Sequence, residues 1–366
     1  MGFNCGIIGL PNVGKSTLFN ALTEKAQADA ANFPFCTIDP NIGQVAVPDV
    51  RLNEIANIVA PAEITPTYLQ FVDIAGLVRG ASKGEGLGNQ FLSNIQEVDA
   101  ICHVIRCFED KNVVHVEKDI DPLRDIEIVE TELMLADLET LEKQSEKLIK
   151  KARGNDKEAK SQLDLVERSI EILNQGRPAR LLELNDEEKA NFYLLNLLSG
   201  KPIFYVCNVD ESAIIGGTDL SNQVMERALQ LEAPSLIVSA KIEEEIIHLT
   251  DPSEQKEFLQ AVGLSDTGLS RIIQSGYELL NLITFFTQGP KEVRAWTITK
   301  GSSALKAAGV IHTDFMRGFI RAETISYQDF TSYGGEQACK ESGKMRQEGR
   351  DYEVQNGDIL LFRFNV

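Results

Sequence analysis

The segment Gly9-Leu10-Pro11-Asn12-Val13-Gly14-Lys15-Ser16 decides the fold of this chain, because it matches the phosphate-binding pattern G-x-x-x-x-G-K-[ST]. The apolar residues 5–8 before it predict a strand, and residues 16–19 predict the start of a helix. Backbone N–H groups of such a loop wrap a phosphate, and the helix N-terminus attracts an anion. The segment therefore predicts an α/β domain that binds a nucleotide through its phosphates.

We expect the residues of this loop to contact the nucleotide in different ways. Lys15 reaches the β- and γ-phosphates, and the Ser16 hydroxyl ligates Mg²⁺. Asn12 has two interpretations, a residue chosen for turn geometry or a ligand of K⁺ in place of an arginine finger. The predicted phosphate contacts are Asn12, Val13, Gly14, Lys15, Ser16 and Thr17.

Two segments downstream extend the pattern towards the γ-phosphate. Thr37 has the position of a switch threonine that closes on Mg²⁺ and the γ-phosphate. Asp73-Ile74-Ala75-Gly76 reads as D-x-x-G after the apolar residues 68–72. In this motif Asp73 holds Mg²⁺ through water, and the Gly76 N–H contacts the γ-phosphate. Lys15, Thr37 and Gly76 are thus predicted catalytic groups, and Ser16, Thr37 and Asp73 are the predicted metal site.

The segments expected beside the base depart from the guanine-reading pattern. Asn208-Val209-Asp210-Glu211 stands where N-K-x-D is usual, and Ser239-Ala240-Lys241 resembles the last loop on the base side. Val209 replaces the lysine that packs along the base, and Glu211 replaces the aspartate with one more methylene. Because bidentate guanine contacts need accurate carboxylate placement, we expect weak guanine selectivity.

ATP is therefore the expected nucleotide, with GTP binding more weakly. The Asn208 amide is expected to face the adenine edge, beside Val209, Glu211, Ser239 and Ala240. The alternative, in which a backbone adjustment lets Glu211 still reach guanine, stays open at this stage.

In this order the motifs resemble those of the YchF subfamily of Obg-like P-loop NTPases, and the resemblance runs from end to end. It is carried by residues 9–17, 32–37, 73–78, 80–82 with 84–91, and 208–211, together with the C-terminal segment. The resemblance implies a G-type domain that hydrolyses ATP in preference to GTP with Mg²⁺. It also implies ribosome binding and a link to translation or stress responses.

Hydrolysis also needs a group that positions the attacking water. Ras-like proteins place a Gln after D-x-x-G, whereas this chain has Leu77, so we expect slow intrinsic turnover. His115 follows the apolar residues 100–107 on the edge where α/β sheets bind ligands. It is either the water-positioning residue or a structural loop histidine. His103 lies inside the strand and is expected to be a satisfied core residue.

Composition limits the classes of protein to which the chain can belong. Its 366 residues suffice for two or three domains, and its six cysteines lack metal-ligand spacing, as is typical of reduced thiols in a cytoplasmic protein. We expect no signal peptide and no membrane span. The net charge of -19 argues against general nucleic-acid binding, although residues 283–366 carry 11 Lys/Arg and 10 Asp/Glu. A local basic patch is therefore compatible with the C-terminal part.

More residues separate Gly76 from Asn208 than a minimal G-domain needs, which indicates an insertion. Apolar positions in residues 134–148 and 159–173 keep a 4-3-4-3 spacing on either side of a turn at residues 153–156. They predict an antiparallel coiled-coil hairpin, either a docking arm or an inert spacer. After residue 282 the pattern changes to strands, and this region resembles a TGS domain, which is a ubiquitin-like β-grasp module.

The predicted fold is α/β: a P-loop NTPase G-domain (1–125 plus 200–282), an inserted antiparallel coiled coil (126–199) and a C-terminal α+β ubiquitin-like β-grasp TGS domain (283–366). The expected function is a ribosome-associated ATP switch that contacts RNA through the C-terminal and coiled-coil regions. Two alternatives are a nucleotide-sensing adaptor with incidental hydrolysis, and a conventional GTPase in ribosome assembly.

Overall fold

Two β-sheets organise the computed structural model, which describes residues 3–30, 41–74, 87–110, 119–154, 156–249 and 251–365. The first sheet has the order β2-β4-β1-β5-β6-β7, and its edge strand β2 runs antiparallel to β4 whereas the other pairs are parallel. Its central strands β5 and β6 are buried along their whole length, as is typical of a parallel sheet covered on both faces. The strands are β1 (Asn4–Ile8), β2 (Ile42–Ala46), β4 (Tyr68–Asp73), β5 (Ala100–Arg106), β6 (Ile203–Asn208) and β7 (Ser235–Val238).

Helices pack against this sheet around one large apolar core. They are α1 (Lys15–Ala30), α3 (Leu87–Gln96), α7 (Asp219–Gln230), α8 (Ala240–His248), α9 (Pro252–Ala261) and α10 (Gly268–Leu279), with a short 3-10 turn η3 (Glu211–Ala213) after β6. Because the central strands are parallel, their carboxyl ends meet at one edge, where the phosphate-binding loop also lies.

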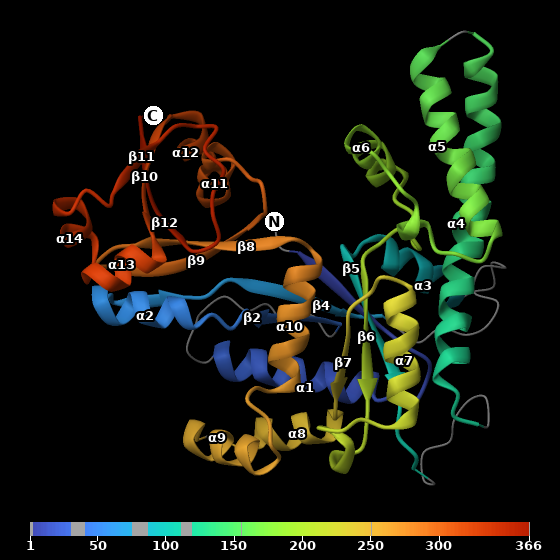
Figure 1. Ribbon diagram of the computed structural model, residues 1–366, viewed down its shortest axis with the longest axis horizontal. Helices are drawn as coiled ribbons and strands as arrows, with labels where there is room; N and C mark the ends of the chain where they lie inside the picture. The colour runs from blue at the N-terminus through green and yellow to red at the C-terminus, as the bar shows by residue number, and fades with distance from the viewer. Residues whose placement is uncertain are drawn as a thin grey trace.

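A helical hairpin projects from this domain (Figure 1) and consists of α4 (Pro122–Ala152) and α5 (Lys157–Asn174). A short turn η2 (Ala179–Leu181) and helix α6 (Asp186–Leu195) return the chain to β6. The predicted apolar stripe forms a separate core that includes Leu141, Val166 and Leu173. The base of α4 belongs to the first core through Ile126, Val129 and Leu133, because these positions share the helix face that meets the sheet.

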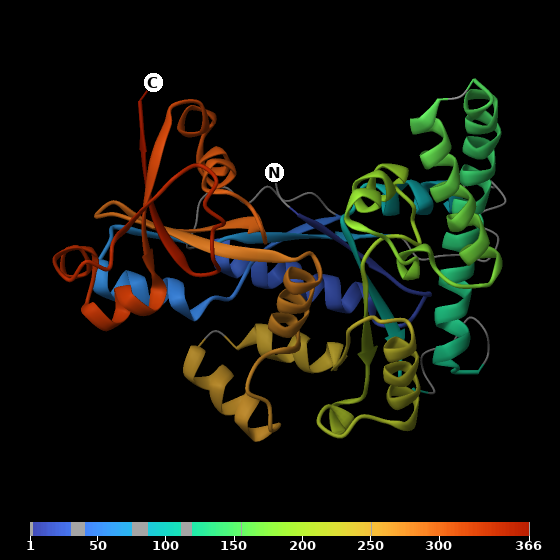
Figure 2. The ribbon, with the colours of Figure 1, turned by 45° about the horizontal axis from the view of Figure 1, so that its top comes forward.

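The second sheet lies on the opposite side of the first domain from the hairpin (Figures 1 and 2) and has the order β11-β10-β12-β8-β9-β3. Its strands are β3 (Glu63–Thr65), β8 (Leu282–Gln288), β9 (Glu292–Thr299), β10 (Phe319–Ser326), β11 (Arg346–Glu348) and β12 (Asp358–Phe364). One face packs on α11 (Ala304–Ile311) and α12 (Thr313–Arg317). The other face packs on α13 (Tyr327–Tyr333) and α14 (Glu336–Glu341), together with α2 (Val50–Val59).

Residues 50–65 join the second sheet, although the sequence analysis assigned them to the P-loop domain. Strand β3 pairs with β9 in parallel, from Glu63 opposite Glu292 to Thr65 opposite Arg294. Leu52 and Ile55 of α2 are buried in the same core as Phe286. This departure arises because α2 is amphipathic, and the second sheet offers the apolar face that covers it.

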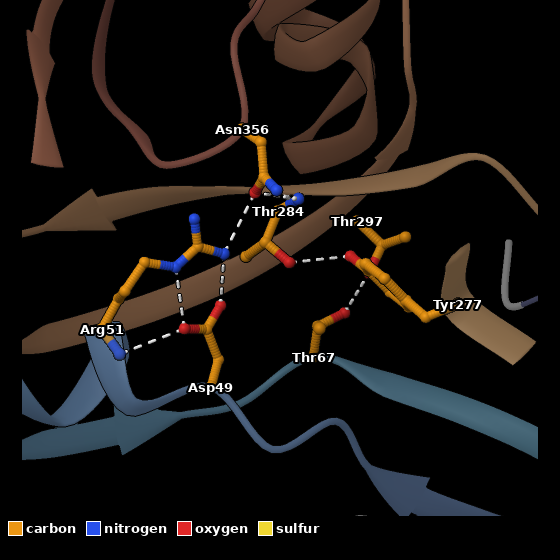
Figure 3. Close-up of polar contacts among 7 residues, drawn as sticks. All are labelled: Asp49, Arg51, Thr67, Tyr277, Thr284, Thr297 and Asn356. Carbon is orange, nitrogen blue, oxygen red and sulfur yellow. Dashed lines mark hydrogen bonds and ion pairs between the residues drawn. The ribbon is translucent and has the colours of Figure 1, made fainter. Parts of the chain in front are cut away.

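A chain of polar contacts joins the two parts where they meet (Figure 3). The Arg51 guanidinium donates to both carboxylate oxygens of Asp49, at 2.9 and 2.7 Å, and to Asn356 Oδ1 at 3.0 Å. The Asp49 carboxylate raises the pKa of Arg51. Beside it, the buried Tyr277 hydroxyl contacts Thr284 Oγ1 at 2.8 Å and Thr297 Oγ1 at 3.1 Å. Thus α2, α10 and the second sheet are held together by hydrogen bonds as well as by apolar packing.

Candidate nucleotide site

The phosphate-binding loop adopts a conformation that its residue types require. Gly14 has φ +91°, and a Cβ there would collide with the side-chain amide of Asn208. A Cβ on Gly9 would lie 2.7 Å from the carbonyl oxygen of Val104. Asn12 has φ +64°, a left-handed conformation that asparagine tolerates better than most residues. Both glycines are therefore needed for close approach of the backbone. The conformation of Asn12 agrees with a role in turn geometry, and K⁺ binding by Asn12 stays a prediction.

Lys15 forms an ion pair with Asp73 at the mouth of this loop. Strands β1 and β4 are adjacent, with Ile7 opposite Asp73, so the D-x-x-G aspartate lies next to the first turn of α1. Lys15 is only 9% exposed, whereas Ser16 on the same turn is exposed. A carboxylate and a hydroxyl are oxygen donors of the kind that Mg²⁺ prefers, so these residues fit the expected metal.

Three predicted catalytic or metal residues, Thr37, Gly76 and His115, lie outside the described residues, as does Leu77. Their predicted roles stay predictions. The remaining loop residues Val13 and Thr17 are buried and half-buried, respectively, around the start of α1.

Asn208 connects two loops of the site. Its Nδ2 donates to the Val13 carbonyl oxygen at 2.9 Å, and its Oδ1 accepts from the Ala240 N–H at 3.0 Å. The side chain is buried, with 6% exposed. Both polar ends of this amide thus hold the phosphate-binding loop against the Ser239-Ala240 loop. The expectation that the amide also faces the adenine edge stays a prediction, because an amide has a further N–H and a further lone pair.

Val209 also differs from its expected position beside the base. It is 2% exposed within the first core, and its N–H donates to the Val238 carbonyl oxygen at 2.9 Å. An apolar side chain after a buried strand favours the core over the ligand side. Ser239 and Ala240 are likewise buried at the start of α8, and the Ser239 hydroxyl has no hydrogen-bond partner among the described residues.

Glu211 lies on the surface and pairs with Lys241, which the sequence placed in the base-side loop but not among the predicted nucleotide contacts. The Lys241 Nζ lies 2.5 Å from Glu211 Oε1, and both side chains are substantially exposed. The Glu211 carboxylate raises the pKa of Lys241. The carboxylate that would contact guanine is thus paired with a cation. The sequence signal for this pairing is the lysine that follows Ser239-Ala240.

Arg106 is a second residue that the motifs missed. It ends β5 at the ligand edge, is 1% exposed, and donates to the carbonyl oxygens of Phe108 and Asp110, both at 3.2 Å. Desolvation lowers the pKa of Arg106. The sequence feature that could have indicated Arg106 is an arginine at the end of a largely apolar strand. In the structure it holds the loop that leaves β5.

Of the two histidines considered in the sequence, His115 lies outside the described residues, whereas His103 is fully buried in β5. Its ring lies 5.7 Å from the ring of Tyr205, and neither ring nitrogen has a hydrogen-bond partner among the described residues. The predicted core position of His103 is confirmed, but the hydrogen bonds expected for its ring nitrogens are not found among the described residues. Burial, reinforced by the charge of Arg180, lowers the pKa of His103 to about 3.

Comparisons with known proteins give a consistent relationship over the full length. Residues 4–153 match a family model described as 50S ribosome-binding GTPase, and residues 282–365 match the YchF-GTPase C-terminal model, described as a protein of unknown function (DUF933). The "Ribosome-binding ATPase YchF" of Escherichia coli O157:H7 is 55% identical over 366 residues, covering all of both chains. The protein of that name from Bacillus subtilis is 50% identical over 368 residues, again with complete coverage.

A solved structure supports the same relationship in three dimensions. The Schizosaccharomyces pombe YchF GTPase superposes with a TM-score of 0.90 at 37% identity and covers 99% of this chain and 98% of its own. A GTP binding protein from Pyrococcus horikoshii OT3, at 20% identity and TM-score 0.61, shares the fold. Within the described ranges, no helix is both long and apolar enough to cross a membrane.

Proposed function

The chain belongs to the YchF family of Obg-like P-loop NTPases, and we propose that it hydrolyses ATP with Mg²⁺ and associates with the ribosome. The observation that carries this proposal is the phosphate-binding loop with Lys15 held at Asp73, at the edge of the first sheet. Relatives of equal length named ribosome-binding ATPase supply the partner.

The chain's own residues contribute binding and charge stabilisation. The N–H groups of the glycine loop and of the first turn of α1 surround the phosphates. Burial of Lys15 strengthens the attraction of its ammonium group for the phosphates, because little water screens it. Ser16 and Asp73 would hold Mg²⁺, which neutralises phosphate charge when bound. We place Thr37 and Gly76 at the γ-phosphate by motif.

The choice of ATP over GTP rests on the base side. The relatives are named ATPases, whereas a matching family model and a solved relative are named GTPases, so names alone do not decide. The burial of Val209 and the pairing of Glu211 with Lys241 support weak guanine reading. We therefore propose ATP as the preferred substrate and GTP as the weaker one.

Water positioning is assigned to His115, and a K⁺ ion at Asn12 is proposed as an aid to charge stabilisation. The variant His115→Ala is expected to bind ATP normally and to lose turnover, and unchanged turnover would remove His115 from the mechanism. Replacing K⁺ by Na⁺ in the same assay tests Asn12, since a K⁺-dependent enzyme loses rate and a turn residue does not respond.

The remaining parts of the proposal concern the partner. The hairpin is proposed as a coiled-coil docking arm, and the C-terminal sheet as a TGS module that contacts RNA or protein. Ribosome association would place the protein in the cytoplasm. In this scheme ATP binding orders the loops around the γ-phosphate, hydrolysis releases them, and the arm and C-terminal module report the state.

Calorimetric titration with non-hydrolysable ATP and GTP analogues plus Mg²⁺ tests the proposal, followed by turnover with and without ribosomes. Tighter ATP binding and ribosome-stimulated turnover are expected. Tighter GTP binding would favour a GTPase, and ATP binding with turnover that ribosomes leave unchanged would favour a nucleotide-sensing adaptor.

A further inference from the structure

The outer end of the helical hairpin is basic, although the whole chain carries a net charge of -19. Residues 143–160 hold seven basic and three acidic side chains. All seven basic residues are exposed in the structure, on both helices and near the turn. This end lies far from the nucleotide site along the length of α4 (Figure 1), so its charge does not serve phosphate binding there.

Most of these cations form no ion pair with a described residue. Lys147, Lys150, Lys151, Arg153 and Lys157 form no ion pair with any described residue, whereas Lys143 pairs with Glu139.

In the C-terminal part, some basic residues are paired, whereas others, such as Lys300 and Lys306, form no ion pair with any described residue. Arg321 pairs with Glu323, Lys344 with Asp329, and Arg346 with Glu348. Pairing reduces the charge that a surface can offer to a polyanion. The hairpin end has seven basic against three acidic residues within residues 143–160, whereas residues 283–366 have 11 against 10, so the hairpin end is the more strongly attractive surface for phosphates.

A groove of about 300 Å³ opens beside this surface, between the hairpin and α6. Lys147 and Lys151 line it together with three side-chain amides, those of Gln144, Gln162 and Asn191. The described structure shows no hydrogen bond for any of these amides. Each amide can donate and accept hydrogen bonds, as the edges of nucleobases require.

The groove also has an apolar side, formed by residues that include Leu148 and Leu165. A flat base buries its faces against such a surface while its edge meets the amides. Helix α6 closes the other side and is fixed to the hairpin by the ion pair of Arg168 Nη1 with Glu188 Oε1 at 2.6 Å. The groove is thus a built feature of three packed helices.

We propose that the outer hairpin and this groove bind an unpaired stretch of RNA, with phosphates on Lys147 and Lys151 and a base in the groove. We favour RNA over an acidic protein because the site combines lysines, side-chain amides and an apolar wall. Unpaired RNA presents phosphates, base edges and base faces together, and these match the three features. The inference rests on the proposed ribosome association in that the ribosome supplies such RNA.

The test uses the full-length protein and a labelled single-stranded RNA of roughly 12 nucleotides, a length within the usual site sizes, read by fluorescence anisotropy over a range of salt. The variant Lys147→Glu/Lys151→Glu should weaken RNA binding by more than tenfold and lower the slope of log K against log salt by about 1 per lysine. The control Lys300→Glu/Lys306→Glu, with the same charge change on exposed lysines of the C-terminal domain, should leave affinity within about twofold.

A charge-neutral variant isolates the groove. Gln144→Ala/Gln162→Ala should weaken RNA binding several-fold without changing the salt slope, and a duplex of the same sequence should bind more weakly than the single strand. Unchanged RNA affinity in the lysine variant, or equal losses in the C-terminal control, would overturn the inference.

Binding of a fluorescent ATP analogue, measured on the same proteins, separates this inference from the proposed function. The hairpin variants should bind the analogue as the unmodified chain does. Failure of the unmodified chain to bind ATP would remove the proposed function and leave the RNA result standing. Failure to bind RNA while ATP binding is intact would remove only the hairpin site.

Discussion

At the scale of single residues, the base side of the nucleotide site is controlled by contacts between protein groups. Asn208 holds the Val13 carbonyl and the Ala240 N–H, so it positions the loops through both ends of its amide. Glu211 is engaged by Lys241 rather than left open for a base. We therefore expect nucleotide preference to depend on Lys241 as well as on the altered N-K-x-D segment.

The variant Lys241→Ala is expected to raise affinity for a GTP analogue by roughly two- to fivefold, the range associated with losing one exposed ion pair. Affinity for the ATP analogue should stay nearly constant, because adenine has no N1–H for Glu211 to accept. Titration calorimetry measures both. Lys256→Ala, which removes an exposed lysine from α9, serves as the charge control. Unchanged or weaker GTP binding in Lys241→Ala would refute a specificity role.

His103 predicts a pH dependence of stability. Burial lowers its pKa from 6.5 to about 3, so the folded state keeps it neutral while the unfolded state takes up a proton below pH 6.5. Folding stability attributable to this group is full above pH 6.5 and declines by about 1.4 kcal/mol per pH unit down to about pH 3. Urea unfolding at pH 7 and pH 5 should therefore show a smaller loss in His103→Leu than in the unmodified chain. Equal losses would mean that His103 is protonated or hydrated in the folded state.

At the scale of elements, one buried carboxylate attaches the hairpin to the segment that leads into β6 of the P-loop domain. Asp137 of α4 accepts from the N–H groups of Leu198 and Ser199, both at 2.8 Å, and from the Ser199 hydroxyl at 2.6 Å. It is 3% exposed, and desolvation raises the pKa of Asp137. These contacts fix the segment between α6 and β6 against the middle of α4.

Replacing Asp137 by Ala should destabilise the protein by roughly 3 kcal/mol, because two buried N–H groups lose their acceptor. Chemical denaturation measures the change. The control Glu139→Ala removes an exposed carboxylate two residues further along the same helix and should alter stability by less than about 0.5 kcal/mol. Similar small effects in both variants would show that water replaces the lost acceptor.

At the scale of the whole molecule, the second sheet is completed by residues from the first domain. Strand β3 extends it beyond β9, and α2 covers one of its faces through Leu52 and Ile55. The polar contacts in Figure 3 lie beside this shared core. The two parts should therefore unfold together rather than independently, and the segment after β2 links the edge of the P-loop sheet to the C-terminal sheet.

Trp296, the single tryptophan of the chain, lies in β9 and reports on the second sheet. Ile55→Ala should lower the stability read by tryptophan fluorescence by roughly 3 kcal/mol, because it leaves a cavity in a core shared with that sheet. Val224→Ala removes a side chain from the first core. If the two parts unfold together, this variant should also lower the stability read by tryptophan fluorescence, by a similar amount. A transition unaffected by Ile55→Ala would mean that the second sheet is stable without α2.

The sequence by itself determined the elements whose signals are local. The glycine loop, the D-x-x-G aspartate at the end of β4 and the apolar stripes of the hairpin each follow from residue type and spacing within a short segment. The relationship to a family also followed from these motifs in order.

Which groups meet across long separations in the chain depends on the three-dimensional fold. In the fold, Asn208 binds Val13 and Ala240, and Val209 is buried. Glu211 pairs with Lys241, and residues 50–65 pack with the second sheet. The fold also pairs some C-terminal cations, such as Arg321 and Lys344, and leaves Lys147 and Lys151 of the hairpin without an ion pair among the described residues. The physical reason is that hydrogen bonds, ion pairs and apolar contacts depend on distance in space, and parallel strands joined by crossovers bring together residues far apart in the chain.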